Sequence, residues 1–190
     1  MKKKLLLMLV LLMSGCVNQE EPESDPAYCS FDSDECLANS DEYETFINES
    51  DVFIEITMQE AIDMFENQES CILYFGFPDC PWCIEALPIM EEAAKENDKN
   101  IYYVQTRDEE RNLIYTDEEK TAILSYVGQF EDTDDEGNVA LFVPLVVVVE
   151  DGEALSGHVG TIEGHDAHER QMNEDEQDQL KGIYVEMFSK

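Results

Sequence analysis

The sequence predicts an α/β protein with a mixed, mostly parallel central sheet, helices on both faces and a C-terminal antiparallel hairpin. Two observations support this fold class. Apolar runs of strand length alternate with segments of helical periodicity, in the order βαβαβαββα. The last two predicted strands are separated only by Asp151-Gly152, a dipeptide typical of hairpin turns. Alternating strands and helices build a parallel sheet, whereas a two-residue turn joins antiparallel neighbours.

We divide the 190 residues into an export signal (1–15), an acidic flexible tether (16–48) and one globular domain (49–190). The signal starts with three lysines, continues as an apolar run over residues 5–13 and ends in Ser14-Gly15-Cys16. Charge, apolar stretch and small residues follow one another in this way in export signals. The apolar run is much shorter than the roughly 20 residues that span a membrane.

The end of the signal resembles the lipobox of bacterial lipoproteins, in which cleavage precedes a cysteine that carries diacylglycerol. Met13 stands where leucine is commoner. The resemblance implies that Cys16 is the lipidated first residue of a protein held on the outer side of the cell membrane. The alternative is an ordinary secretory signal with an incidental cysteine. Acyl chains contribute about 0.8 kcal/mol per buried methylene, so they would anchor the chain without a membrane-spanning helix.

The formal net charge is −34, and losing the three N-terminal lysines would take it to −37. Nucleic acids and anionic lipid head groups would repel such a chain, so neither is expected as a partner. Solubility is the simplest explanation of the acidity, and a cationic client is a second one.

The tether is rich in Ser, Asp, Glu and Pro and nearly free of aliphatic residues, so it cannot bury enough apolar area to offset the cost of ordering. It contains Cys29 and Cys36, which we expect to close a small structural disulfide in an oxidising compartment. A second redox pair is the alternative. Nothing shaped like a helix N-terminus adjoins these two cysteines.

The first half of the domain is predicted as three strands and two helices. Thr57 and Glu60 are spaced as a capping box at the start of the first helix. The continuous apolar run at 71–75 is typical of a buried parallel strand. In chain order we expect a strand at 52–56, a helix at 57–65, a strand at 71–75, a helix at 82–97 that contains Pro88, and a strand at 101–104.

The second half is predicted as a helix at 117–130, an acidic turn at 131–138, a strand at 145–149, a strand at 153–159 and a helix at 173–188. The run at 145–149 is so apolar and β-branched that we expect it inside the sheet. The strand at 153–159 should pair back against it through the Asp151-Gly152 turn.

Cys80 and Cys83 lie two residues apart, between the strand at 71–75 and the helix that follows it. Only a thiolate attacks disulfides, so one thiol of a redox pair must ionise near neutral pH. A helix N-terminus favours the thiolate, because it carries unpaired N–H groups and about half a positive charge. Pro81 suits a first helical turn. The setting therefore favours a redox pair, with the first sulfur at the exposed end and the second one turn inward.

At this point the chain resembles the thioredoxin-fold thiol–disulfide oxidoreductases over about residues 50–190. Four features carry the resemblance: the Cys80-Pro81-Trp82-Cys83 motif, its place at a strand-to-helix junction after a βα unit, Pro88 where the family has a helix-kinking proline, and Val143-Pro144 before an apolar strand. The first feature alone is only moderately specific, whereas the four in register are strong.

The resemblance implies that Cys80 is the attacking thiol and Cys83 the resolving thiol. It implies that the Val143–Pro144 bond is cis and faces the dithiol, and that the Val143 backbone holds a client peptide as an added strand. No dissociable cofactor is needed, because the Cys80–Cys83 disulfide carries the electrons. Trp82, between the cysteines, would be an exposed client contact, with a place in the core as the alternative.

Three residues depart from the family pattern or bear on it. Tyr74 stands six residues before Cys80, where thioredoxins have a buried aspartate that relays protons. Glu85 is a candidate substitute, although we expect a solvated surface carboxylate. Asp79 should raise the pKa of Cys80 and so oppose the helix.

The Pro-Trp pair between the cysteines resembles the Pro-Tyr of glutaredoxins and the motifs of extracytoplasmic thioredoxin-like proteins, including those that accompany bacteriocin export. Redox potentials among such relatives run from roughly −270 to −120 mV, and the sequence does not place this chain on that scale. The direction of exchange therefore stays open among reduction, oxidation and isomerisation.

Other uses of these cysteines are less favoured. A zinc site would need further ligands, for which the candidates are Cys29, Cys36, His158, His165 and His168. His165 and His168 are better explained as surface histidines, and no metal is expected. A purely structural Cys80–Cys83 disulfide would close too short a loop to gain much stability. Cys71, on an apolar strand, should be a buried and inert thiol.

The sequence thus predicts a monomeric, membrane-anchored, extracytoplasmic thiol–disulfide oxidoreductase that exchanges disulfides of exported proteins or peptides. A reductase or isomerase would need electrons from a membrane redox partner, and an oxidase would need an acceptor. The alternative is a thioredoxin-fold lipoprotein that binds a peptide or exported partner without turnover. A thiol peroxidase is disfavoured, because Cys83 follows Cys80 so closely.

Overall fold

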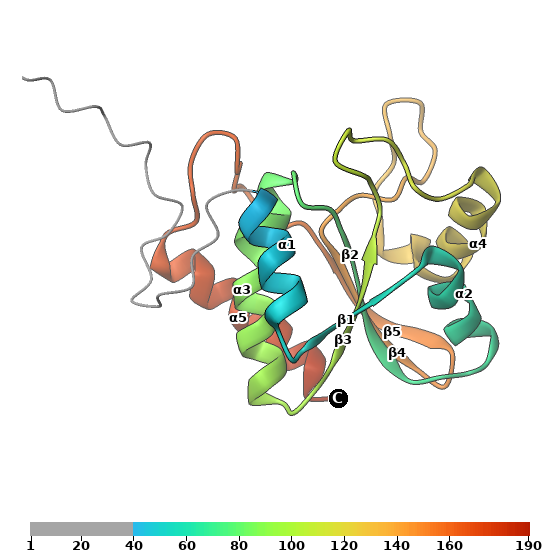
Figure 1. Ribbon diagram of the computed structural model, residues 1–190, viewed down its shortest axis with the longest axis horizontal. Coiled ribbons are helices and arrows are strands. Elements are labelled where there is room, and N and C mark those ends of the chain that lie inside the picture. The colour runs from blue at the N-terminus through green and yellow to red at the C-terminus, as the bar shows by residue number, and fades with distance from the viewer. Residues whose placement is uncertain (1–39) are drawn as a thin grey trace, which may run out of the picture.

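The sheet has five strands in the spatial order β1-β3-β2-β4-β5, and helices cover both of its faces (Figure 1). The computed structural model describes residues 40–190. The expected signal peptide, the lipidation at Cys16 and the Cys29–Cys36 disulfide lie outside the described residues. The elements are α1 (Ser40–Glu49), β1 (Phe53–Ile56), α2 (Met58–Glu66), β2 (Cys71–Gly76), α3 (Pro81–Glu96), β3 (Ile101–Gln105), α4 (Asp117–Val127), the 3-10 helix η1 (Gly128–Phe130), β4 (Leu145–Glu150), β5 (Glu153–Val159) and α5 (Glu174–Phe188).

Strand directions agree with the predicted mixed sheet. Strands β1, β3 and β2 are parallel, while β4 is antiparallel to both of its neighbours, β2 and β5. Four strands therefore point the same way and only β4 runs against them. Asp151 and Gly152, at the hairpin between β4 and β5, have positive φ angles of 50° and 77°, as a tight hairpin turn requires.

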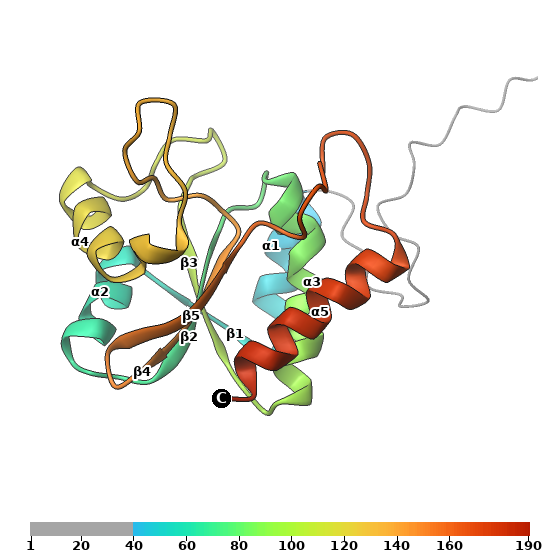
Figure 2. The ribbon, with the colours of Figure 1, turned by 180° about the vertical axis from the view of Figure 1, so that it is seen from behind.

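Two buried layers follow from the alternation of side chains along the inner strands. On β2, Ile72 and Tyr74 face one layer, and Leu73 and Phe75 face the other. The first layer lies under α1, α3 and α5, and the second lies under α2 and α4, as Figures 1 and 2 show. Burial on both faces explains why the strand at 71–75 reads as a continuous apolar run.

Helix α1 corrects the expected boundary of the tether. Residues 40–48 were expected to be flexible, yet they form most of this helix. Its acidic composition hides a short apolar face, because Tyr43 and Ile47 lie one helical turn apart and are buried in the first layer. The folded domain therefore includes residues 40–48.

Capping boxes begin α2, α4 and α5, with Thr57, Thr116 and Asn173 as the capping residues. Helix α3 is the exception, because its N-cap residue is Cys80. No helix among residues 40–190 is both long and apolar enough to span a membrane.

Candidate functional site

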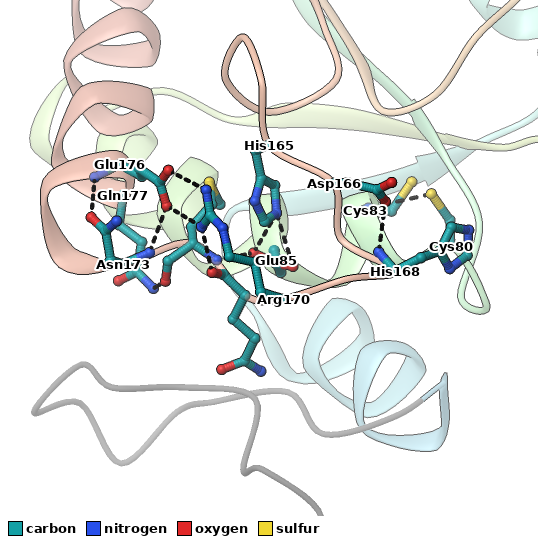
Figure 3. Close-up of polar contacts among 12 residues, drawn as sticks. Cys80, Cys83, Glu85, His165, Asp166, His168, Arg170, Asn173, Glu176 and Gln177 are labelled. Atoms are coloured by element: carbon teal, nitrogen blue, oxygen red, sulfur yellow. Dashed lines mark hydrogen bonds and ion pairs between the residues drawn. The ribbon is translucent and has the colours of Figure 1, made fainter.

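The two cysteines lie where the chain leaves β2 and enters α3. Cys80 has extended backbone angles (φ −105°, ψ 111°) as the N-cap residue, and Pro81 takes the first helical position. The Cys83 N–H donates a hydrogen bond to the Cys80 sulfur at 3.3 Å (Figure 3). Cys80 thus takes the capping role usually filled by Ser, Thr or Asp, so its sulfur faces the positive end of the helix dipole.

Both cysteines are free thiols in this structure, and their surroundings differ. Cys80 is 3% exposed and borders a cavity of about 460 Å³, whereas Cys83 is 0% exposed and sits inside the first layer. This matches the expected order of an outer and an inner sulfur. Cys80 is therefore the cysteine that lines the cavity, whereas Cys83 is enclosed behind it.

The same surroundings separate the pKa values of the two thiols. Hydrogen bonds from the Cys83 thiol and from the Cys83 and Trp82 N–H groups lower the pKa of Cys80, against the opposing effect of burial. The pKa of Cys83 is raised well above its ordinary value, mainly by burial and further by the neighbouring Cys80. Cys80 is therefore the thiol that ionises first and the better nucleophile of the pair.

The Val143–Pro144 peptide bond is cis, as the resemblance implied, and it lies beside the dithiol. The Cys80 thiol donates a long hydrogen bond of 3.8 Å to the Val143 carbonyl oxygen. Val143 also borders the cavity at Cys80. The structure thus brings together two residues that are 63 positions apart in the chain.

Asp79 does not oppose the helix as expected, because Arg111 neutralises it. The Arg111 guanidinium forms an ion pair with the Asp79 carboxylate and donates a second hydrogen bond of 3.0 Å to the Asp79 carbonyl oxygen. The charge of Arg111 also lowers the pKa of Cys80. No sequence pattern indicates this contact, since Arg111 lies in the loop between β3 and α4, 32 residues away.

We expect the replacement of Arg111 by alanine to raise the pKa of Cys80 and to slow its alkylation at pH 6–7. The effect should be a few-fold at most and should shrink in 1 M salt, because the Arg111 side chain is 58% exposed. The rate of iodoacetamide reaction at Cys80, followed against pH, measures it. Arg170→Ala is the matched control, because Arg170 is also an exposed arginine paired with a carboxylate, Glu176. Equal pH profiles for Arg111→Ala and Arg170→Ala would contradict the expectation.

Glu85 is buried rather than solvated, which corrects the sequence expectation. Its side chain is 6% exposed, accepts a hydrogen bond from the Met172 N–H at 2.8 Å and lies 3.1 Å from His165 Nε2 (Figure 3). Burial raises the pKa of Glu85, and the bond from Met172 and the neighbouring His165 oppose that rise. The carboxylate is thus engaged with the 160–173 loop, which it holds against α3, and it is not available as a substitute for the missing buried acid.

His165 is not the surface histidine expected, whereas His168 is exposed as predicted. His165 is 8% exposed and contacts Glu85, while the His168 ring packs edge-on against Trp82 at a centroid distance of 4.7 Å. Trp82 is half-buried, packs on the first layer and borders the cavity at Cys80. Trp82 thus contacts both the core and the cavity at Cys80.

The remaining candidates within residues 40–190 are a metal site, Cys71 and Tyr74. Among residues 40–190, no three His, Cys, Asp or Glu side chains are grouped to hold a metal ion. Cys71 is half-buried on β2, and burial raises the pKa of its thiol to about 12, so it is unreactive at neutral pH. Tyr74 is fully buried, and its hydroxyl shares a 2.7 Å hydrogen bond with the Tyr43 hydroxyl of α1. Sequence reasoning missed Tyr43, because it lies in the acidic segment taken for a tether.

No protein-family model and no curated protein matches the sequence. Among solved structures, similarity extends to a putative oxidoreductase with a thioredoxin fold (14% identity, 60% of this chain and 87% of that chain, TM-score 0.40). It also extends to thioredoxin from Aeropyrum pernix (22% identity, 57% of this chain and 76% of that chain, TM-score 0.37). A third similar structure is an uncharacterised thioredoxin-like protein from Clostridium perfringens (20% identity, 76% of this chain and 88% of that chain, TM-score 0.39).

The described residues have a thioredoxin-like fold, with a five-stranded mixed sheet, a C-terminal antiparallel hairpin and helices on both faces. This confirms the fold class predicted from the sequence.

Proposed function

We propose that this chain is a thiol–disulfide oxidoreductase that acts on exported proteins or peptides. The observation that carries the proposal is the Cys80 thiol itself. It caps α3, its pKa is lowered, and it lies between a cavity on one side and the buried Cys83 on the other. A thiolate that is both accessible to a client and backed by a second thiol is what dithiol exchange requires.

The reaction proceeds in two exchanges. The Cys80 thiolate attacks one sulfur of a client disulfide, so that a Cys80–client S–S bond forms and the other client sulfur leaves as a thiolate. The Cys83 sulfur then attacks Cys80, which forms the Cys80–Cys83 disulfide and releases the second client thiolate. The client gains two electrons and the dithiol loses two; the reverse sequence oxidises a client dithiol.

We place the protein outside the cytoplasm, anchored through lipid on Cys16, where client disulfides exist. Continuous turnover as a reductase would draw electrons from a membrane redox partner, and turnover as an oxidase would pass them to an acceptor. Incorporation of labelled fatty acid at Cys16 tests the anchor. The redox potential of the Cys80–Cys83 pair, measured against glutathione buffers, decides the direction.

The function is tested with the dithiothreitol-reduced chain and insulin as the disulfide substrate. We expect the native chain to reduce insulin, Cys80→Ser to lose this activity, and Cys83→Ser to accumulate a mixed disulfide on Cys80 that mass spectrometry detects. Cys71→Ser is the control and should retain activity, because that thiol is protonated and lies away from the cavity at Cys80.

A native chain that neither reduces insulin nor oxidises a model dithiol would overturn the proposal. That result would favour the alternative, a lipoprotein that binds a peptide or exported partner without turnover.

A further inference from the structure

The buried position before the cysteines holds a pair of tyrosines instead of an acid. Tyr74 of β2 and Tyr43 of α1 are both 0% exposed, and their hydroxyl oxygens are 2.7 Å apart. A buried hydroxyl is costly unless it is hydrogen-bonded, and here each satisfies the other. One proton of the pair lies between the two oxygens, and the other is available to a further acceptor.

The Tyr74 ring points along β2 toward α3. A Cβ atom built on Gly76 would lie 2.4 Å from the Tyr74 hydroxyl oxygen, so the hydroxyl occupies the space that the missing side chain leaves. Residue 76 is the last of β2, and the chain passes from it into the turn that carries the cysteines. The hydroxyl therefore lies at the end of the strand that faces the dithiol.

Cys83 is packed in the same buried layer and is surrounded by tyrosines. It interacts electrostatically with Cys80 and with one tyrosine from each of four elements: Tyr43 of α1, Tyr74 of β2, Tyr103 of β3 and Tyr184 of α5. All four tyrosines belong to the same buried layer as Cys83, and of them Tyr74 is the one whose side chain lowers the pKa of Cys83. The Tyr184 hydroxyl is equally buried and has no hydrogen-bond partner.

On the basis of the proposed function, we propose that Tyr74 is a positioning residue for the resolving step. Its hydroxyl donates a hydrogen bond to the Cys83 sulfur as that thiol ionises, and the Tyr43 hydroxyl donates to Tyr74 in turn. A hydrogen bond to a charged acceptor is stronger than one to a neutral acceptor, so the pair favours the Cys83 thiolate over the thiol. Helix α1 thereby becomes part of the site.

The tyrosines do not take the proton themselves. Burial raises the pKa of both Tyr43 and Tyr74 well above the ordinary value, so both remain protonated and act only as hydrogen-bond donors. In the resolving step the Cys83 sulfur bonds to the Cys80 sulfur, and the Cys80–client bond breaks with its electron pair on the client sulfur. The proton that Cys83 loses ends on that client thiolate, so that charge and protons balance over the step.

The test titrates Cys83 in the full chain with a Cys80→Ser replacement, using the carbon-13 NMR shift of the Cys83 Cβ. We expect Tyr74→Phe to move the titration midpoint to higher pH and Tyr43→Phe to move it in the same direction by less. Tyr184→Phe is the matched control, because it removes a buried hydroxyl near Cys83 that makes no hydrogen bond. In Tyr184→Phe the titration midpoint of Cys83 should equal that of the chain with Cys80→Ser alone.

A kinetic arm uses the chain with both cysteines and a preformed mixed disulfide between Cys80 and a small thiol. Tyr74→Phe should slow its resolution roughly tenfold at pH 7 while leaving the rate of attack by Cys80 unchanged. An unchanged midpoint in Tyr74→Phe, or an equal shift in Tyr184→Phe, would overturn the proposal. The titration reads Cys83 without any client, so it decides this inference even if insulin reduction fails.

Discussion

Replacing Tyr43 by alanine is expected to lower the free energy of unfolding by about 3–5 kcal/mol, the range typical of deleting a buried aromatic ring. The ring is 0% exposed and packs edge-on against Tyr103 at a centroid distance of 6.0 Å. Its loss would leave a cavity between α1 and the sheet and an unpaired hydroxyl on Tyr74. Urea unfolding of the full chain, followed by circular dichroism, measures the change.

Two further variants in α1 separate the loss of ring packing from the loss of the hydrogen bond. Tyr43→Phe keeps the ring and loses only the hydrogen bond, so it should cost about 1 kcal/mol. Asn48→Ala lies on the exposed side of the same helix and should stay within about 0.5 kcal/mol of the native chain. A loss below 1 kcal/mol in Tyr43→Ala would mean that α1 is not part of the cooperative unit.

Replacing Gly76 by alanine is expected to cost about 1–3 kcal/mol or more, because the new methyl group has no space. It would lie 2.4 Å from the Tyr74 hydroxyl oxygen and 2.6 Å from the ring carbon that carries it. Tyr74 cannot retreat easily, since it is fully buried, stacked on Tyr103 and bonded to Tyr43. The same variant should disturb the hydrogen bond that we propose from Tyr74 to Cys83, so the titration of Cys83 should shift as well.

The control is Gly182→Ala on α5, where an added Cβ would meet nothing within 4 Å. Because alanine is the better helix former, this variant should be neutral or more stable by up to about 1 kcal/mol. The cost of Gly76→Ala should fall in a Tyr74→Leu background, since the smaller side chain leaves room for the methyl group. An undiminished cost in that background would assign the effect to the backbone of β2 instead.

The fold was largely predictable because its signals are local. Buried strands flanked by helices on both faces must be apolar at every position, and the runs at 71–75 and 145–149 show this directly. Caps mark helix starts in the sequence, as Thr57 with Glu60 does for α2. Helix α1 was missed because two buried side chains, Tyr43 and Ile47, are too few to outweigh the acidic residues around them.

The site was predictable in part for the same reason. Cys80 and Cys83 lie within one helical turn of each other, so their spacing and the strand before them already indicated an outer and an inner thiol. The expectation for Asp79 was wrong because it took the charge of that carboxylate as unpaired. The expectations for Glu85 and His165 were wrong because each took a side chain in a polar stretch as solvated. The partners that neutralise or bury them come from distant loops.

By itself, the sequence determined the succession of strands and helices along the chain from β1 onward, the hairpin at Asp151-Gly152 and the position of the dithiol at a helix N-terminus. These depend on residues close together in the chain. Only the tertiary structure decided which groups surround the thiols, since the pairs Tyr43–Tyr74 and Glu85–His165 join residues 31 and 80 positions apart. Periodicity and spacing indicate which side chains are buried. They do not indicate which partners burial brings within hydrogen-bonding distance, and it is these partners that set the pKa of each sulfur.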